Sequence, residues 1–144
     1  PDATESEVPD AAESEAPGAQ LEQYQEAIKA IQLNPSDAKA YYNRGLAYYS
    51  LGQYQEAITD YDKAIRIDPL KATFYFDRGI VYHKVGQYEK AIKDYDEAIR
   101  LDPKHAAAYH NRGITYDELG RSLEAERNFA KAKELDYNPE DYLQ

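Results

Sequence analysis

Three histidines are the residues of this sequence best suited to binding a metal ion or transferring a proton near neutral pH; they are His83, His105 and His110. A zinc site on a helix typically uses two histidines in HExxH spacing, and other zinc sites add cysteine or carboxylate ligands. No HExxH occurs in the 144-residue chain, which also contains no cysteine. We therefore predict no metal site.

Paired carboxylates, which act as general acid and base in many enzymes, also occur. They are Asp60 with Asp62, and Asp94 with Asp96. The second pair repeats the first at an interval that recurs throughout the chain, which indicates a solvent-exposed helix face rather than a catalytic centre. The GxxxxGK[ST], GxGxxG and GxSxG motifs are absent. We therefore predict no catalytic residue, no cofactor and no enzyme activity.

The chain is acidic, with a formal net charge of −10, and lacks the excess of Lys and Arg that neutralises phosphates. We expect no nucleic-acid partner. No apolar run approaches the roughly 20 residues that span a bilayer, so we expect a soluble protein without a membrane span. The absence of cysteine suits cytoplasmic and exported locations equally. The chain has no methionine, so we expect a further region upstream of Pro1.

The first twenty residues differ in composition from the rest. They contain six acidic residues, no Lys or Arg and almost no large apolar side chain. Such a segment cannot bury enough apolar surface to offset the entropy lost on ordering. We predict a disordered acidic tail over residues 1–20.

A 34-residue interval organises the remainder of the chain. It separates Gly45, Gly79 and Gly113 from one another. The same interval relates three further series, which are Gly52, Gly86 and Gly120; Ala57, Ala91 and Ala125; and Ala64, Ala98 and Ala132. A period of this length with small residues at fixed places is typical of repeat proteins.

Each unit contains two amphipathic segments joined by a tight turn. Tyr41, Gly45 and Tyr48 recur at helical spacing in the first segment, and the second carries its own apolar stripe. Glycine inside a helix costs about 1 kcal/mol relative to alanine, so Gly45 needs a packing reason. We expect the second helix to approach it closely through the small residues Ala57 and Ala64, with Tyr41, Tyr48 and Tyr61 filling the space beside that contact. The pattern predicts helices at about 21–33, 38–51, 54–67, 72–85, 88–101, 106–119 and 122–135.

This pattern resembles the tetratricopeptide repeat (TPR) over about residues 38–136. Short segments of the sequence are similar to those of bacterial members of the family. The resemblance implies an all-α fold, a right-handed α-solenoid of helix-turn-helix units with about seven helices. It divides the chain into the tail, a TPR domain over 21–136 and a C-terminal tail over 137–144. Within the domain we expect a leading helix at 21–35 and repeats at 38–71, 72–105 and 106–136.

Both ends of the array depart from the pattern. In the last unit, polar or charged residues replace apolar ones of the other units at Ser122, Glu126 and Lys133. These substitutions predict that no fourth repeat follows. We expect the exposed end to be covered by Tyr137, Tyr142 or Leu143. The leading helix has no first-helix partner in its own unit, so it is either a capping helix or pairs with a second copy or an upstream region.

In the family that the chain resembles, the first helices of the units line a concave groove that binds a partner. The resemblance implies a protein-protein interaction scaffold that binds a partner peptide or protein segment. Carried over position by position, the partner-binding groove consists of Lys39, Tyr42, Leu46, Tyr49, Ser50, Thr73, Phe76, Ile80, His83, Lys84, His110, Ile114 and Asp117, with Ala107 and Glu118 beside them.

The chemistry of this groove predicts the kind of partner. Leu46, Ile80 and Ile114 form an aliphatic row, and Lys39 and Lys84 lie beside it. A partner with apolar anchors and some negative charge would be complementary. The carboxylate clamp that some family members use for chaperone C-termini needs Lys, Arg and Asn at positions that here hold Tyr42, Leu46, Asp77, Ala107 and Asn111. We therefore expect no binding of that type.

Two alternatives stay open. The unpaired leading helix could make the chain a self-assembling homo-oligomer, or the acidic tail could occupy the groove as a built-in ligand. A repeated arginine beside the packing glycine, at Arg44, Arg78 and Arg112, is expected to be structural, with its guanidinium paired to a repeat acid such as Asp60 or Asp94.

Overall fold

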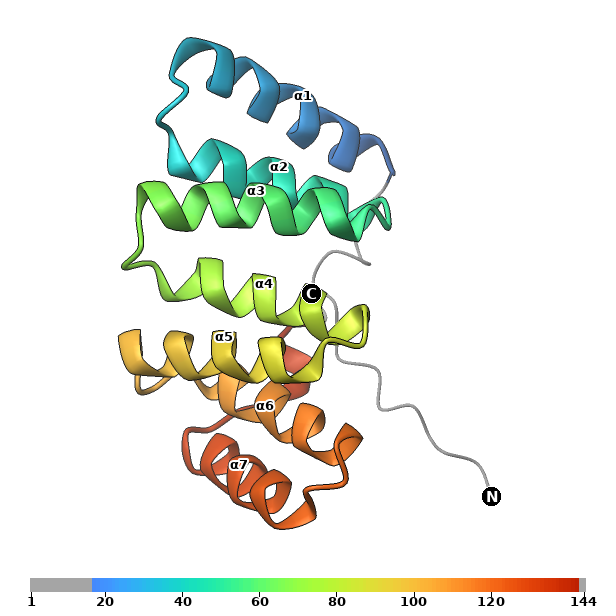
Figure 1. The fold of residues 1–144 in the computed structure, drawn as a ribbon, viewed down its shortest axis with the longest axis vertical. Helices are drawn as coiled ribbons and strands as arrows, with labels where there is room; N and C mark the ends of the chain where they lie inside the picture. The colour runs from blue at the N-terminus through green and yellow to red at the C-terminus, as the bar shows by residue number, and fades with distance from the viewer. Residues whose placement is uncertain (1–16, 143–144) are drawn as a thin grey trace.

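The computed structural model describes residues 17–142, which form seven α-helices and one short 3-10 helix. The helices are α1 (Pro17–Leu33), α2 (Ala38–Ser50), α3 (Tyr54–Ile67), α4 (Ala72–Lys84), α5 (Tyr88–Leu101), α6 (Ala106–Glu118), α7 (Ser122–Glu134) and η1 (Pro139–Tyr142). Figure 1 shows them stacked in sequence order from α1 to α7. The described residues contain no strand, and the predicted all-α solenoid is confirmed.

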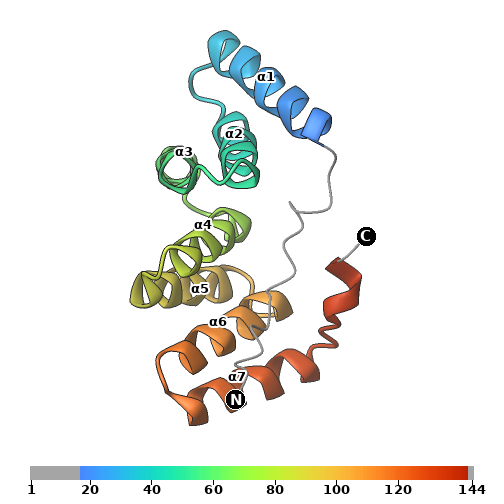
Figure 2. The ribbon, with the colours of Figure 1, turned by 90° about the vertical axis from the view of Figure 1, so that its right-hand side faces the viewer.

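The stack is curved. Each helix packs on its neighbours in sequence, and α4 also contacts α6. Figure 2 shows α3 and α5 on one side of the stack, whereas α1 and the C-terminal segment reach toward the other side. The helices α2, α4 and α6 are thus the first helices of the three repeats and face the inside of the curve.

The leading helix begins earlier than we predicted. We expected residues 1–20 to form the tail, but α1 starts at Pro17. Proline is well suited to the first position of a helix, since the amide that it lacks has no partner there. Residues 1–16 lie outside the described residues, as do Leu143 and Gln144. Every other predicted helix start agrees with the structure.

The glycines inside the first helices leave room for aromatic rings. A Cβ atom built on Gly45 would lie 2.6 Å from Cε1 of Tyr61, which is completely buried. The same relation holds between Gly79 and Tyr95, where the distance would be 2.7 Å. Our expectation of close helix approach is therefore right, but the neighbour is an aromatic side chain rather than the small Ala57 or Ala64.

The turn inside each repeat depends on a left-handed glycine. Gly52 has φ of 74°, and the amide of Gln53 donates to the carbonyl of Tyr48 at 2.8 Å. This 6→1 hydrogen bond ends α2 in a Schellman motif. Because only glycine adopts this φ without strain, the turn between the two helices of a repeat is encoded locally, and Gly86 and Gly120 serve the next two repeats.

The repeated arginines pair with acids of the repeats, as we expected, and Arg78 also reaches the preceding repeat. Nε and Nη2 of Arg78 donate to the two carboxylate oxygens of Asp94 at 2.8 and 2.7 Å, and Nη1 donates to Asp62 at 2.8 Å. Asp94 lies on α5 of the same repeat, whereas Asp62 lies on α3 of the preceding one. A single guanidinium therefore connects three helices. Arg44 makes the equivalent bidentate pair with Asp60.

The C-terminal segment turns back along the inner side of the stack, beside α6 (Figure 2). Tyr137 stacks on His110 of α6, with ring centroids 4.4 Å apart. Tyr137 thus folds back as we expected, but it packs on α6 and does not cover the exposed end of α7. It follows a tight turn in which Asp136 adopts φ of 60°. The residues that predicted the absence of a fourth repeat, Ser122, Glu126 and Lys133, are all exposed.

Among the described helices, none combines the length and apolar character that crossing a membrane requires.

Candidate functional site

The predicted groove residues lie on α2, α4 and α6, and we call the surface that they form the inner face. They differ in accessibility. Lys39, Thr73, Lys84 and Asp117 are exposed, as is Glu118. The half-buried ones are Tyr42, Leu46, Ser50, Phe76, Ile80, His83 and His110, whereas Tyr49, Ala107 and Ile114 are buried.

Two of the predicted anchors are therefore core residues. Tyr49 is 6% exposed and packs against Ala57 and Ile58 of the neighbouring helix. Ile114 is 7% exposed and lies one helical turn after His110, which Tyr137 covers. The expected aliphatic row thus stops at Ile80. Neither side chain is accessible to a partner in this structure.

Tyr42 links the first two repeats across the inner face. Its hydroxyl donates to Oδ2 of Asp77 at 2.5 Å, and its ring lies 5.0 Å from that of Phe74. Burial raises the pKa of the Tyr42 hydroxyl, and the negative charge of Asp77 raises it further. The hydroxyl is consequently committed to a structural hydrogen bond and stays protonated.

The next repeat interface lacks this hydrogen bond. Phe76 stands where Tyr42 stands one repeat earlier, and Asn111 stands in the place of Asp77. Asn111 is 4% exposed, and its Oδ1 atom has no hydrogen-bond partner. A buried acceptor without a donor is costly, because it has lost its hydration without replacement.

We expect the substitution Phe76→Tyr to stabilise the protein by about 1 kcal/mol, since the new hydroxyl would reach Asn111 as Tyr42 reaches Asp77. The matched control is Tyr42→Phe, which removes the existing donor and should cost about 1 to 2 kcal/mol. Urea unfolding followed by circular dichroism measures both changes. A Phe76→Tyr variant that unfolds at lower urea than the parent would contradict this account.

His83 takes part in a buried polar contact. Its Nδ1 atom lies 2.9 Å from Oγ1 of Thr115, which is fully buried and donates to the carbonyl of Asn111 at 2.9 Å. Because the threonine hydrogen is used in that bond, Nδ1 of His83 is the donor to Oγ1. Burial lowers the pKa of His83, although Glu118 opposes the effect. His83 is therefore neutral at pH 7 and joins α4 to α6.

The other two histidines are also packed rather than free. His105 precedes α6 and accepts from the amide of Ala108 through Nδ1 at 3.1 Å, and its ring lies 4.6 Å from Phe76. Burial lowers the pKa of both His105 and His110. None of the three histidines adds positive charge to the inner face at neutral pH. Within residues 17–142, no group of His, Asp or Glu is arranged to hold a metal ion.

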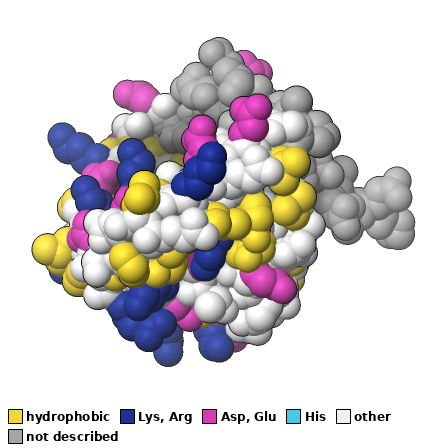
Figure 3. All heavy atoms as spheres, turned by 90° about the horizontal axis from the view of Figure 1, so that it is seen from above, with side chains coloured by type: hydrophobic (Ala, Val, Ile, Leu, Met, Phe, Trp, Pro, Cys, Tyr) yellow, Lys and Arg dark blue, Asp and Glu magenta, His cyan; other side chains and the backbone are white. Residues whose placement is uncertain are grey.

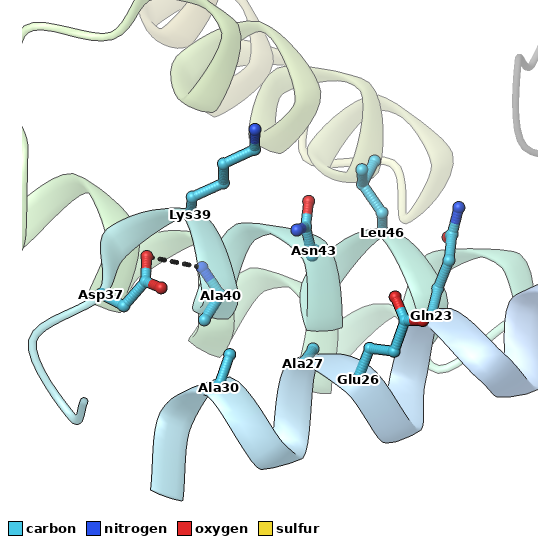
Figure 4. Close-up of a pocket in the computed structure, with 9 residues that line it drawn as sticks. All are labelled: Gln23, Glu26, Ala27, Ala30, Asp37, Lys39, Ala40, Asn43 and Leu46. Atoms are coloured by element: carbon cyan, nitrogen blue, oxygen red, sulfur yellow. Dashed lines mark hydrogen bonds between the residues drawn. The ribbon is translucent and has the colours of Figure 1, made fainter. Parts of the chain in front are cut away.

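A hollow of about 390 Å³ opens at the α1 end of the inner face. It is lined by Gln23, Glu26, Ala27 and Ala30 of α1, and by Asp37, Lys39, Ala40, Asn43 and Leu46 at α2. Figure 4 shows Lys39, Asn43 and Leu46 rising from α2 on one side, with Ala27 and Ala30 of α1 directed toward that helix. We call this feature the α1–α2 hollow.

Most of the residues lining the hollow were missed by the sequence analysis. Only Lys39 and Leu46 were among the predicted groove residues. Asn43 lies four positions after Lys39 and three before Leu46, so helical spacing alone would have placed it on the same face. The α1 residues had no comparable signal, because their place depends on how α1 packs against α2.

The surface at this end of the stack has mixed chemistry. Figure 3 looks down on it from the α1 end and shows patches of hydrophobic side chains among basic and acidic ones. Leu33 at the end of α1 is 88% exposed, and Leu21 is 55% exposed. Such a surface suits a partner that brings apolar anchors as well as polar groups.

Comparison with known families identifies the repeats. Profiles described as "TPR repeat" match residues 45–86 and 85–120, and profiles described as "Tetratricopeptide repeat" match residues 24–59 and 106–139. The chain belongs to the tetratricopeptide-repeat family. A comparison with curated protein sequences finds no match.

Solved structures of TPR proteins are similar to this chain. A crystal structure of MamA is 31% identical with a TM-score of 0.78, and the match covers 83% of this chain and 70% of MamA. The second TPR of Spaghetti (RPAP3), bound to the HSP90 peptide SRMEEVD, is 32% identical with a TM-score of 0.68, covering 74% of this chain and 98% of that one. MamA residues 41 to the end from Desulfovibrio magneticus RS-1 are 26% identical with a TM-score of 0.73, covering 82% and 69%.

Proposed function

We propose that this TPR protein is a non-catalytic interaction scaffold that holds a segment of a partner polypeptide on its inner face. Membership of the TPR family supports this function, as does the similar RPAP3 domain, which binds a peptide. The observation that carries the proposal is the position of Leu46 and Ile80. Both are large aliphatic side chains that are half-buried against the core and keep part of their surface on the inner face, where they can bury further surface against a partner.

The charges of the inner face favour a partner with some negative charge. Lys39 and Lys84 are exposed on the first two repeats, whereas the exposed acids Asp117 and Glu118 lie on the third. A partner segment would thus place its acidic residues near α2 and α4. Because Tyr49 and Ile114 are buried, the anchoring side chains that we propose are Leu46, Phe76 and Ile80, with Tyr42 beside them.

The partner differs from the peptide bound by RPAP3. Asp77 of α4 stands where a carboxylate clamp uses asparagine in its second repeat. The Tyr42 hydroxyl is already bonded to Asp77, and the carboxylate of Asp77 would repel a C-terminal carboxylate. We therefore propose an internal segment of a partner, rather than a free acidic C-terminus, as the ligand.

Charging the two aliphatic anchors tests the function. In the double variant Leu46→Glu and Ile80→Glu, we expect capture of the native partner from a source lysate to be lost, because buried carboxylates without partners oppose association. The helix content measured by circular dichroism should stay unchanged. The matched control is Leu70→Glu with Leu123→Glu, two residues that are 70% and 68% exposed away from the inner face. Equal capture by the inner-face variant and the control would refute the proposal.

Self-assembly through α1 is the second candidate, because Leu21 and Leu33 are exposed on that helix. Sedimentation across a range of concentrations decides this point, since a strict monomer at high concentration excludes it. In a third candidate, the acidic tail occupies the inner face. This idea involves residues 1–16, which lie outside the described residues. Deleting residues 1–16 would raise partner affinity if the tail competes, and an unchanged affinity would end that idea.

A further inference from the structure

The second helices of the three repeats show which side chains α1 would carry beside the α1–α2 hollow if it followed their pattern. In every repeat, an aromatic ring of the second helix lies against the glycine of the first helix; these rings belong to Tyr61, Tyr95 and Phe129. The leading helix α1 occupies the place of a second helix, because its end, AIQLNP at 30–35, corresponds to AIRIDP at 64–69. Ala30 therefore corresponds to Ala64, and Ala27, three residues before Ala30, corresponds to Tyr61, three residues before Ala64.

Two features leave this hollow open: a methyl group replaces the ring, and the described residues contain no first helix for the unit to which α1 belongs. Ala27 is 3% exposed and Ala40 is 2% exposed, so both form its floor. Where the other repeats place an aromatic ring between helices, this end of the stack has a space of about 390 Å³. A ring needs much less, since a cavity of about 150 Å³ binds benzene.

We propose that the α1–α2 hollow binds an aromatic side chain, phenylalanine or tyrosine, of the partner polypeptide. The proposal rests on the proposed function, because Lys39 and Leu46 belong both to the hollow and to the inner face. The alanine floor supplies apolar contact for the ring. The amides of Gln23 and Asn43 line the same space and can meet a tyrosine hydroxyl or the partner's main chain.

We assign the aromatic occupant to a partner polypeptide rather than to the tail of this sequence or to a second copy of it. Residues 1–16 contain no Phe, Tyr or Trp. Among the side chains described between residues 18 and 140, no aromatic one is exposed, so a second copy has none to offer from that part of the chain. The outer surface of α7, which would face α1 in a head-to-tail stack, presents Glu126 and Lys133. Charged groups of this kind disfavour insertion into an alanine-floored hollow.

The binding of a small aromatic probe tests the pocket without knowledge of the partner. N-acetyl-phenylalaninamide is titrated against the full chain carrying 13C-labelled alanine methyl groups. We expect saturable shifts of the Ala27, Ala30 and Ala40 signals with a Kd of about 1 mM, the range expected for so small a ligand. N-acetyl-alaninamide, which lacks the ring, should shift none of them. Equal shifts at Ala125 and Ala132 of α7, or no shift at up to tenfold the expected Kd, would overturn the proposal.

Substitutions that place a larger α1 side chain in the hollow provide the second part of the test. Ala27→Phe restores the ring that the repeats carry and should abolish probe binding. Since this larger side chain can also displace α1, Ala30→Leu is the milder variant, with an expected tenfold or greater weakening. Ala19→Leu makes the same change at an exposed position of α1 and should leave binding unchanged.

Probe binding that persists in both filled variants, while they keep parental helix content, would refute an aromatic pocket. This outcome is separate from failure of the proposed function, because the probe assay involves no partner. An inner face that does not bind polypeptides would instead be recognised by unchanged capture in the Leu46→Glu and Ile80→Glu variant.

Discussion

Replacing Gly79 by valine should lower the free energy of unfolding by about 3 kcal/mol, since it forces methyl groups into a fully packed site. Even a single Cβ at this position would lie 2.7 Å from Cε1 of Tyr95, whose side chain is buried on all sides. The gain in helix propensity over glycine, about 1 kcal/mol at most, is too small to compensate. Thermal unfolding should show a midpoint lower by about 10 °C.

A double variant separates the steric cause from a general sensitivity of α4. Combining Gly79→Val with Tyr95→Leu removes the ring that the new methyl groups meet. We expect the double variant to be more stable than the sum of the two single changes indicates, by about 1 kcal/mol or more. Strict additivity of the two single effects would show that Tyr95 is not the obstacle.

Asp94→Ala should destabilise the protein by about 2 kcal/mol, because it leaves the guanidinium of Arg78 with only half of its anionic contacts. Asp94 is 5% exposed and accepts two hydrogen bonds from Arg78. Asp62 remains as a partner of Arg78 at 2.8 Å. The loss of stability is therefore smaller than it would be if the guanidinium kept no carboxylate partner. Urea unfolding at neutral pH measures the difference.

The chain itself supplies the control for this prediction. In the third repeat, Asn128 replaces the buried aspartate, and its Oδ1 accepts from Nε of Arg112 at 2.7 Å. The neutral amide thus satisfies the same arginine position. Asp94→Asn should therefore cost only about 1 kcal/mol, about half the loss in Asp94→Ala. Equal losses in the two variants would show that the lost negative charge, rather than the hydrogen bond or the cavity, sets the cost.

Much of the fold could be predicted because each element is encoded locally and repeated three times. The left-handed glycines at 52, 86 and 120 fix the turns, and proline after the second helices fixes their ends. Arg44 and Arg78 could be paired with Asp60 and Asp94 because all four recur at the repeat interval. The packing reason for Gly45 was only partly predictable, since helical spacing shows which faces meet but not which side chain fills the space.

The inner face was harder to predict, because accessibility depends on neighbours beyond the helix itself. Tyr49 has the spacing of a groove residue, yet the second helix of its own repeat buries it. His110 has the same spacing and is covered by Tyr137, which lies after the last helix. The α1–α2 hollow lies beside α1, which has Ala27 in the place of a tyrosine and no first helix of its own unit among the described residues. A pattern read along one helix carries no information on such contacts.

The stacking of Tyr137 on His110 determines how this array can be lengthened. The equivalent residues of the first two repeats also pack against a ring from further along the chain, Tyr42 against Phe74 of α4 and Phe76 against His105, which directly precedes α6. The third unit obtains its ring from its own chain end, so an appended unit would compete with Tyr137 for the same place. Internal duplication of residues 72–105 would leave Tyr137 on His110, whereas a unit added directly after α7 would have to displace Tyr137.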